Sequence, residues 1–138
     1  FFREKQTIGL ELEPTVRRLK EKYPDREWMS CDFASPPAIS CDLVICSDII
    51  EHLPDPNQLL AFIRALAPRF IVFSTPDRNL FRLGTHKGPP FNPAHVREWS
   101  MPEFRAYIES TFEVLDHFIS FPAQCTQCVL ARPYPTGK

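Results

Sequence analysis

The chain has 138 residues, 43% of them hydrophobic, and 16 lysines and arginines stand against 17 aspartates and glutamates. This size and apolar content suit one compact domain over residues 1–138. The balanced charge is typical neither of a nucleic-acid binder nor of a membrane-surface protein, and no apolar run approaches the roughly 20 residues that cross a bilayer. We therefore expect a small-molecule partner, with no nucleic acid and no membrane.

The chain holds five cysteines, and three of them lie inside apolar, strand-like runs where a free thiol behaves as a small hydrophobe. Cys125 and Cys128 have the C-x-x-C spacing, but neither a second such pair nor a histidine pair with zinc-finger spacing accompanies them. This pattern predicts structural thiols in a reducing, cytoplasmic setting and no metal site.

The first half of the chain alternates strand and helix patterns. Residues 6–13 alternate apolar and polar side chains, which predicts a strand, and Pro14 suits the first turn of a helix that runs toward Pro24. Residues 26–33 predict a second strand. Residues 41–47 predict a third, and their continuous apolar run suits burial on both faces.

The second half opens with a helix whose start, Asp55 to Gln58, has the pattern of a capping box, and Ser100 to Glu103 repeats that pattern before another helix. Residues 69–76 predict a fourth strand, and the two runs 112–120 and 124–132 predict an antiparallel pair. The order predicts an α/β fold, a mostly parallel sheet with helices on its faces that a C-terminal hairpin closes.

Acidic side chains recur where the predicted parallel strands end, which is where such sheets bind ligands. Glu11 or Glu13 follows the first strand, Asp32 the second and Asp48 the third. An ionised carboxylate there accepts the hydroxyl protons of a ribose or an amino proton of an adenine. The alternative is that these acids cap helices or face water.

Five stretches, taken together and in this order, resemble the class I S-adenosylmethionine-dependent methyltransferases, in particular their small-molecule and glycan-modifying branch. They are IGLELEP, CDF, CDLVICSDIIEHLPDP, FIVFSTPDRN and NPAHVREWSMPEFRAYIE. The resemblance implies a Rossmann-like fold, S-adenosylmethionine as cofactor and methyl transfer to a small-molecule or sugar-like acceptor. It also implies that Glu11 binds the cofactor ribose, that Asp32 and Phe33 contact adenine, and that Ser47 and Asp48 lie near the methionine part.

The chain departs from that family in one large respect. It has four glycines, at positions 9, 84, 88 and 137, and no G-x-G, so the family's first strand and glycine-rich loop are missing. We expect either that further residues precede Phe1, which the absence of an initial methionine favours, or that the sheet pairs again across a homodimer. The missing loop also leaves a second hypothesis, a methyltransferase-like binding module without catalytic activity. A third hypothesis, a dehydrogenase fragment, agrees poorly with the predicted C-terminal hairpin.

Catalytic candidates lie in two places. Glu51 and His52 are either an acid/base pair or the turn that leads to the next helix, and His95 is the first candidate for a general base because its NPAHVREW context resembles a segment bordering the family's substrate pocket. The long segment 76–100 interleaves basic and aromatic side chains and is expected either to close over an acceptor or to be an ordinary solvated loop. Its basic residues are Arg78, Arg82, His86, Lys87, His95 and Arg97.

Overall fold

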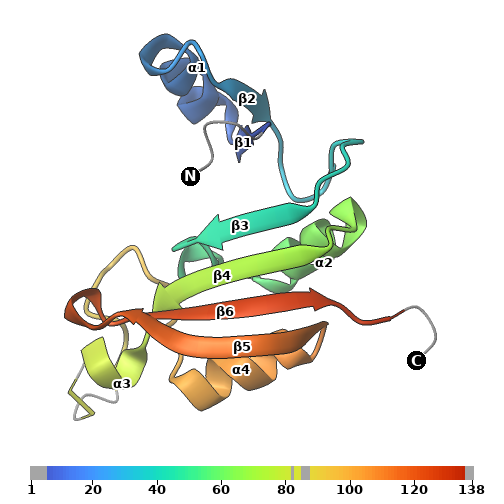
Figure 1. Ribbon diagram of the computed structural model, residues 1–138. Helices are drawn as coiled ribbons and strands as arrows, with labels where there is room; N and C mark the ends of the chain where they lie inside the picture. Colours follow the sequence, from blue (N-terminus) through green and yellow to red (C-terminus); the bar gives the residue numbers. More distant parts are fainter. Residues whose placement is uncertain (1–5, 82, 85–87, 136–138) are drawn as a thin grey trace. The chain divides into compact units, whose positions relative to one another are not determined.

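The computed structural model describes residues 6–81, 83–84 and 88–135 (Figure 1). The chain divides into two compact units, residues 1–38 and 39–138, and each is described by itself. The expectation of one domain over residues 1–138 stays a prediction. Among the described helices, none has the length and apolar character needed to cross a bilayer.

The first unit is a strand, a helix and a second strand. Strand β1 (Ile8–Glu11) and strand β2 (Glu27–Ser30) pair in parallel, and helix α1 (Glu13–Lys22) connects them, with proline in its first turn as predicted. Gly9 lies opposite Trp28, and a Cβ atom on Gly9 would collide with the indole ring. Glycine at this position therefore permits the close packing of β1 against the Trp28 side chain.

The second unit contains a four-stranded mixed sheet in the order β3-β4-β6-β5 (Figure 1). Strands β3 (Leu43–Ser47) and β4 (Phe70–Pro76) pair in parallel, while β6 (Thr126–Pro133) runs antiparallel to both β4 and β5 (Phe112–Phe121). The short 3₁₀ helix η2 (Pro122–Gln124) joins β5 to β6. The predicted C-terminal antiparallel hairpin is therefore present.

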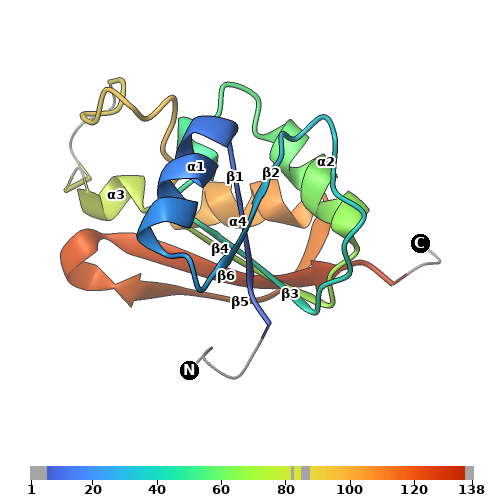
Figure 2. The same cartoon turned by 90° about the horizontal axis from the view of Figure 1, so that it is seen from above.

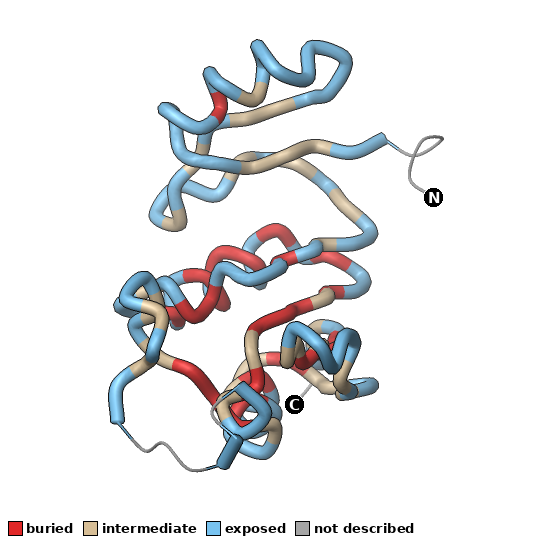
Figure 3. Tube along the Cα trace, turned by 90° about the vertical axis from the view of Figure 1, so that its left-hand side faces the viewer, coloured by how far each residue is buried: buried red, intermediate tan, exposed pale blue. Residues whose placement is uncertain are grey.

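Helices α2 (Asn57–Leu66) and α4 (Met101–Glu109) lie on the same side of this sheet (Figure 2). The strand residues that alternate toward that side form a core with the helices. Its fully buried members include Ile71 and Phe73 of β4, Val129 and Ala131 of β6, and Phe104 and Ile108 of α4. Figure 3 shows that buried positions concentrate in residues 39–138, whereas Val16 is the buried position among residues 6–38.

The burial expected for the third strand is wrong within this structure. Leu43 and Ile45 are exposed, Ile45 at 54%, although both belong to the continuous apolar run. The reason is topological, because helices α2 and α4 cover the face of the sheet to which Cys46 and Phe73 point, whereas Leu43 and Ile45 alternate to the other face.

Of the two predicted capping boxes, one forms. Ser100 and Glu103 exchange the expected bonds at the start of α4, where the Glu103 carboxylate accepts the backbone N–H of Ser100 at 2.8 Å. At α2, Asp55 Oδ1 accepts the Asn57 N–H at 3.1 Å, but the Gln58 amide donates to the other oxygen of Asp55 instead of forming the backbone bond. The prediction for Asp55 to Gln58 is therefore wrong in its second bond.

Candidate functional site

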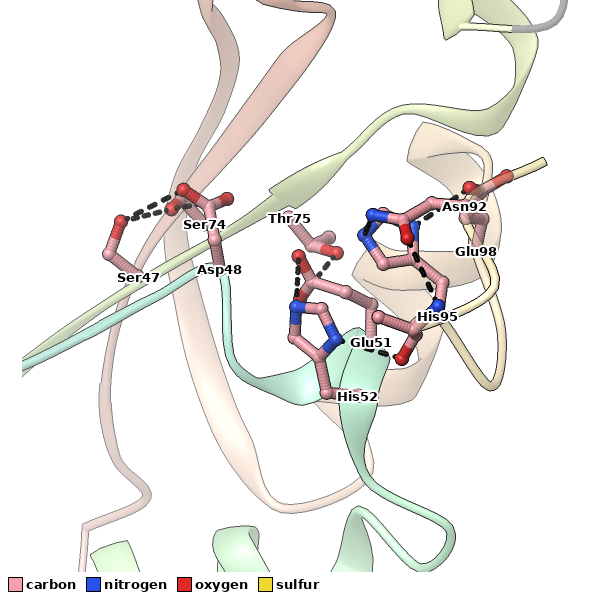
Figure 4. A network of polar contacts seen from close by, with 10 residues as sticks. Ser47, Asp48, Glu51, His52, Ser74, Thr75, Asn92, His95 and Glu98 are labelled. Atoms are coloured by element: carbon pink, nitrogen blue, oxygen red, sulfur yellow. Dashed lines mark hydrogen bonds and ion pairs between the residues drawn. The ribbon is translucent and has the colours of Figure 1, made fainter. Parts of the chain in front are cut away.

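The carboxyl ends of β3 and β4 meet in a small polar network (Figure 4). Ser47 lies opposite Ser74 in the parallel register, and their hydroxyl oxygens are 2.8 Å apart. The Asp48 carboxylate accepts from Ser74 at 3.2 Å and from Ser47 at 3.3 Å. The structure therefore joins the two predicted residues, Ser47 and Asp48, at one strand end and adds Ser74, which no sequence pattern indicated.

The backbone turns sharply at Asp48. Its φ of 51° lies in the left-handed region, which aspartate tolerates better than most side chains, and its N–H donates to the Ser74 carbonyl at 3.0 Å. This conformation ends β3 and directs the chain into the 3₁₀ helix η1 (Ile50–His52). Left-handed residues of this kind gather at functional sites, where surrounding bonds hold them in place.

Glu51 is buried within η1, with 1% of its surface exposed. The Thr75 hydroxyl donates to its Oε2 at 3.1 Å, and its backbone carbonyl accepts the N–H groups of Val96 at 2.8 Å and Arg97 at 3.3 Å. These bonds fasten η1 to the end of β4 and to the segment around residue 96. Glu51 therefore has a structural role in the turn, which is one of the two alternatives stated for the Glu51 and His52 pair.

The segment 92–98 brings His95 beside this turn. Its ring lies 4.9 Å from the His52 ring, edge to face. His95 Nδ1 is 2.9 Å from Glu98 Oε1, and its Nε2 is 3.0 Å from the Asn92 amide nitrogen. His52 Nδ1 is 2.9 Å from the Ala94 carbonyl oxygen. The sequence alone showed no group that orients the Glu51 and His52 pair. In the structure, the Ala94 carbonyl of this segment orients the His52 ring.

One potential ligand atom from each of Glu51, His52 and His95 lies within 4.8 Å of the other two (Figure 4). We call these residues the Glu-His-His cluster. One carboxylate and two imidazoles are a donor set able to hold a metal ion. The sequence did not predict this cluster. Its residues do not have the short spacing of a metal-binding motif, because His95 is distant in sequence from Glu51 and His52.

The remaining predicted cofactor residues belong to the first unit. Glu11 is exposed at the end of β1, and its carboxylate accepts the Leu12 N–H at 3.3 Å. Asp32 follows β2, and its Oδ1 accepts the N–H groups of Ala34 at 2.9 Å and Ser35 at 3.0 Å, while Phe33 beside it is half-buried. Because β1 and β2 are parallel, Glu11 and Asp32 follow strand ends at the same edge of this pair.

The described basic side chains of segment 76–100 make internal contacts. Arg78 pairs with Glu103 at 2.7 Å and also bonds the Glu98 carbonyl, so it ties the start of α3 (Arg78–Phe81) to α4. Arg97 donates to the Pro54 carbonyl at 2.6 Å. Arg82, His86 and Lys87 lie outside the described residues. The description of an acceptor-closing loop therefore stays a prediction.

Burial raises the pKa of the Glu51 carboxyl group above its ordinary value of 4.5, although hydrogen bonds from backbone and Thr75 offset part of the effect. The folded chain then keeps this proton to higher pH than the unfolded chain. Its contribution to stability is complete below pH 4.5 and is lost as pH rises through the raised value. In metal-free buffer, we expect urea unfolding to show this loss in the wild type and not in Glu51→Gln.

The matched control is Glu109→Gln, a surface carboxylate paired with Arg105. This variant should keep the wild-type dependence of the free energy of unfolding on pH. An identical pH dependence in wild type and Glu51→Gln would contradict the assignment of the effect to Glu51.

Comparison with known families decides the kind of protein. The family model described as "Methyltransferase domain" matches residues 2–124. The chain belongs to this methyltransferase family. The resemblance stated from the sequence is thereby confirmed, and S-adenosylmethionine is the cofactor that the family implies.

Among curated relatives, a probable S-adenosylmethionine-dependent methyltransferase of Mycolicibacterium smegmatis is 34% identical over 118 residues, which cover 81% of this chain and 45% of the relative. The chain thus spans less than half the length of the curated relatives it matches.

Solved structures share the fold. The PH0226 protein of Pyrococcus horikoshii has a TM-score of 0.67 at 15% identity, covering 94% of this chain and 72% of its own. Magnesium protoporphyrin IX methyltransferase of Synechocystis, solved with S-adenosylhomocysteine, has a TM-score of 0.62 at 18% identity, covering 92% and 64%. These likenesses confirm the predicted α/β methyltransferase fold with its mixed sheet and C-terminal antiparallel hairpin.

Proposed function

We propose that this chain forms part of an S-adenosylmethionine-dependent methyltransferase that acts on a small-molecule or sugar-like acceptor. The observation that carries the proposal is the family match over residues 2–124 together with the polar network at the β3 and β4 ends. In parallel sheets, this edge is where ligands bind. The balanced charge of the chain supports a small acceptor over a polyanionic one.

The proposed cofactor residues are Glu11 for the ribose, Asp32 and Phe33 for adenine, and Ser47 and Asp48 near the methionine part. The positions of Glu11 and Asp32 after parallel strands support the first two roles, because ionised carboxylates accept hydroxyl and amino protons there. The exposed carboxylate of Asp48, held by two serines, is suited to accept from an ammonium group.

His95 is the proposed catalytic residue. When bound, the cofactor supplies a sulfonium methyl group that is already reactive, so the protein mainly positions the two substrates. As a general base, His95 would take the acceptor's hydroxyl or amine proton on Nε2 while the acceptor forms its bond to the methyl carbon and the sulfonium bond breaks. The Asn92 amide donates to Nε2, so an acceptor hydroxyl would have to displace that bond.

The cellular compartment and the oligomeric state of the protein are predictions from the sequence. All five cysteines are free thiols, which supports a reducing compartment such as the cytoplasm. A homodimer that pairs through β3, the outermost strand of the four-stranded sheet, is the proposed assembly, and sedimentation of the purified chain would test it.

The deciding experiment is calorimetric titration of the chain with S-adenosylhomocysteine, with a nicotinamide dinucleotide as the comparison ligand. We expect saturable binding of the first and none of the second. A chain whose circular dichroism shows a folded protein but which binds neither ligand would contradict the cofactor proposal and favour the inactive binding module.

A further inference from the structure

We propose that the Glu-His-His cluster is a binding site for one divalent transition-metal ion. The proposal concerns residues 51, 52 and 95 alone, all within the second unit, and it does not depend on cofactor binding. Four features of the cluster carry it: the buried carboxylate, the protonation of the two rings, the spacing of the ligand atoms and access from solvent.

The first feature is the fixed orientation of the Glu51 carboxylate. Thr75 donates to Oε2, and Oε1 lies 3.9 Å from His52 Nε2, which is too far for a hydrogen bond. Ionising a buried carboxyl group costs free energy unless a positive charge lies close to it. A cation between Glu51 Oε1 and the two imidazole rings would provide that positive charge, at the place toward which the Glu51 carboxylate already points.

The second feature is the protonation of the two histidines. A carbonyl oxygen only accepts, so His52 Nδ1 carries the hydrogen that bonds Ala94, and in the neutral ring the lone pair is on Nε2. In His95, Nε2 accepts from the Asn92 amide, so Nδ1 carries the hydrogen that bonds Glu98. Metal-binding histidines typically donate their second nitrogen to a carbonyl or carboxylate in this way. In each ring, therefore, Nδ1 already donates a hydrogen bond as it would in a metal site, and Nε2 is the nitrogen that would bind the ion.

The third feature is spacing. Ligands that bind Zn²⁺ tetrahedrally at about 2.0–2.1 Å lie about 3.3 Å from one another. Glu51 Oε1 lies 3.9 Å from His52 Nε2, and all three ligand atoms lie within 4.8 Å of one another, so closure by up to about 1.5 Å would form the site.

The fourth feature is access. The His52 side chain is 39% exposed, whereas those of Glu51 and His95 are 1% and 7% exposed. An ion can therefore reach the cluster past His52 while two ligands remain anchored in the interior. Two imidazoles and one carboxylate favour Zn²⁺, Mn²⁺, Fe²⁺ or Co²⁺ over Ca²⁺ and Mg²⁺, which prefer oxygen ligands. A bound ion would occupy the His95 lone pair, and His95 would then hold the ion in place of accepting the acceptor's proton.

The test is titration of the chain, first stripped with EDTA, with Zn²⁺ by calorimetry and with Co²⁺ by its visible absorption, both at fixed pH. We expect one ion per chain. Glu51→Gln, His95→Gln and His52→Gln should each weaken binding by about 100-fold or more, because loss of a second-sphere partner alone typically costs 10–100-fold. His52→Gln changes a part-exposed side chain, so it keeps the test valid if either buried variant fails to fold by circular dichroism.

Three variants serve as comparisons. Glu109→Gln removes a surface carboxylate and Cys125→Ser removes a thiol of the C-x-x-C pair, and both should bind as the wild type does. Asn92→Asp removes the amide that competes for His95 Nε2 but keeps an oxygen for the Ala94 N–H, so it should bind at least as tightly. The proposal is overturned if the folded wild type binds no ion, or if Cys125→Ser loses binding while the three ligand variants keep it.

Discussion

Glu11→Ala is expected to weaken binding of S-adenosylhomocysteine by about 100-fold or more in a calorimetric titration. A carboxylate that accepts two ribose hydroxyls contributes about 1.5–3 kcal/mol through each charge-assisted bond, and alanine provides no acceptor. Glu11 is exposed and its carboxylate accepts the N–H of the neighbouring Leu12, so the substitution should leave the fold intact. The loss would therefore report on the ligand and not on unfolding.

Glu13→Ala is the matched control. Glu13 is the other acid of this stretch, but it begins helix α1 instead of ending β1. Its loss should reduce cofactor affinity by less than about threefold and slightly destabilise the helix, whose N-terminus favours negative charge. If Glu13→Ala lost binding and Glu11→Ala kept it, the assignment of the ribose contact to Glu11 would be wrong.

Phe73→Ala is expected to lower the free energy of unfolding by about 3–5 kcal/mol. Phe73 is fully buried in β4, and its ring lies 6.0 Å from the ring of Phe112. Truncation removes apolar contact and leaves a cavity between the central strands and the helices. Thermal unfolding followed by circular dichroism should show a midpoint lower by roughly 10–20 °C.

Phe118→Ala is the comparison for Phe73→Ala. Phe118 belongs to β5 of the same sheet but is 44% exposed, so its truncation should cost roughly 1 kcal/mol or less. Equal losses in the two variants would show that the core does not lie on the helix side of the sheet.

Phe73→Ala is also expected to weaken cofactor binding, because β4 carries Ser74 and Thr75 at its carboxyl end and the substitution loosens this strand.

Local patterns in the sequence were sufficient for several elements. The period of two before Pro14, the apolar β-branched run at residues 69–76 and the Ser100 to Glu103 box each specify an element through neighbours close along the chain. The structure has β1, β4 and the start of α4 where these patterns predict them. Element ends were less certain, because β1 and β2 are shorter than the runs that predicted them.

Those local patterns could not predict contacts between segments that are distant in the sequence. The apolar run in β3 indicates a strand but not whether both of its faces are covered, and Ile45 is exposed because it points to the face opposite helices α2 and α4. Arg78 likewise reads as a loop cation in the sequence, whereas its guanidinium is fixed by Glu103 of α4. In both cases, the deciding contact comes from a segment distant in sequence.

The sequence by itself determined the family of this protein, the order of its strands and of helices α1, α2 and α4, and the acids that follow the parallel strands. The tertiary structure alone decided that His95 lies beside Glu51 and His52, because the Glu51 carbonyl binds the N–H groups of Val96 and Arg97. Sequence spacing encodes which side chains share a face of one element. It does not encode which distant loop a buried turn binds, since that depends on hydrogen bonds formed only when the chain has folded.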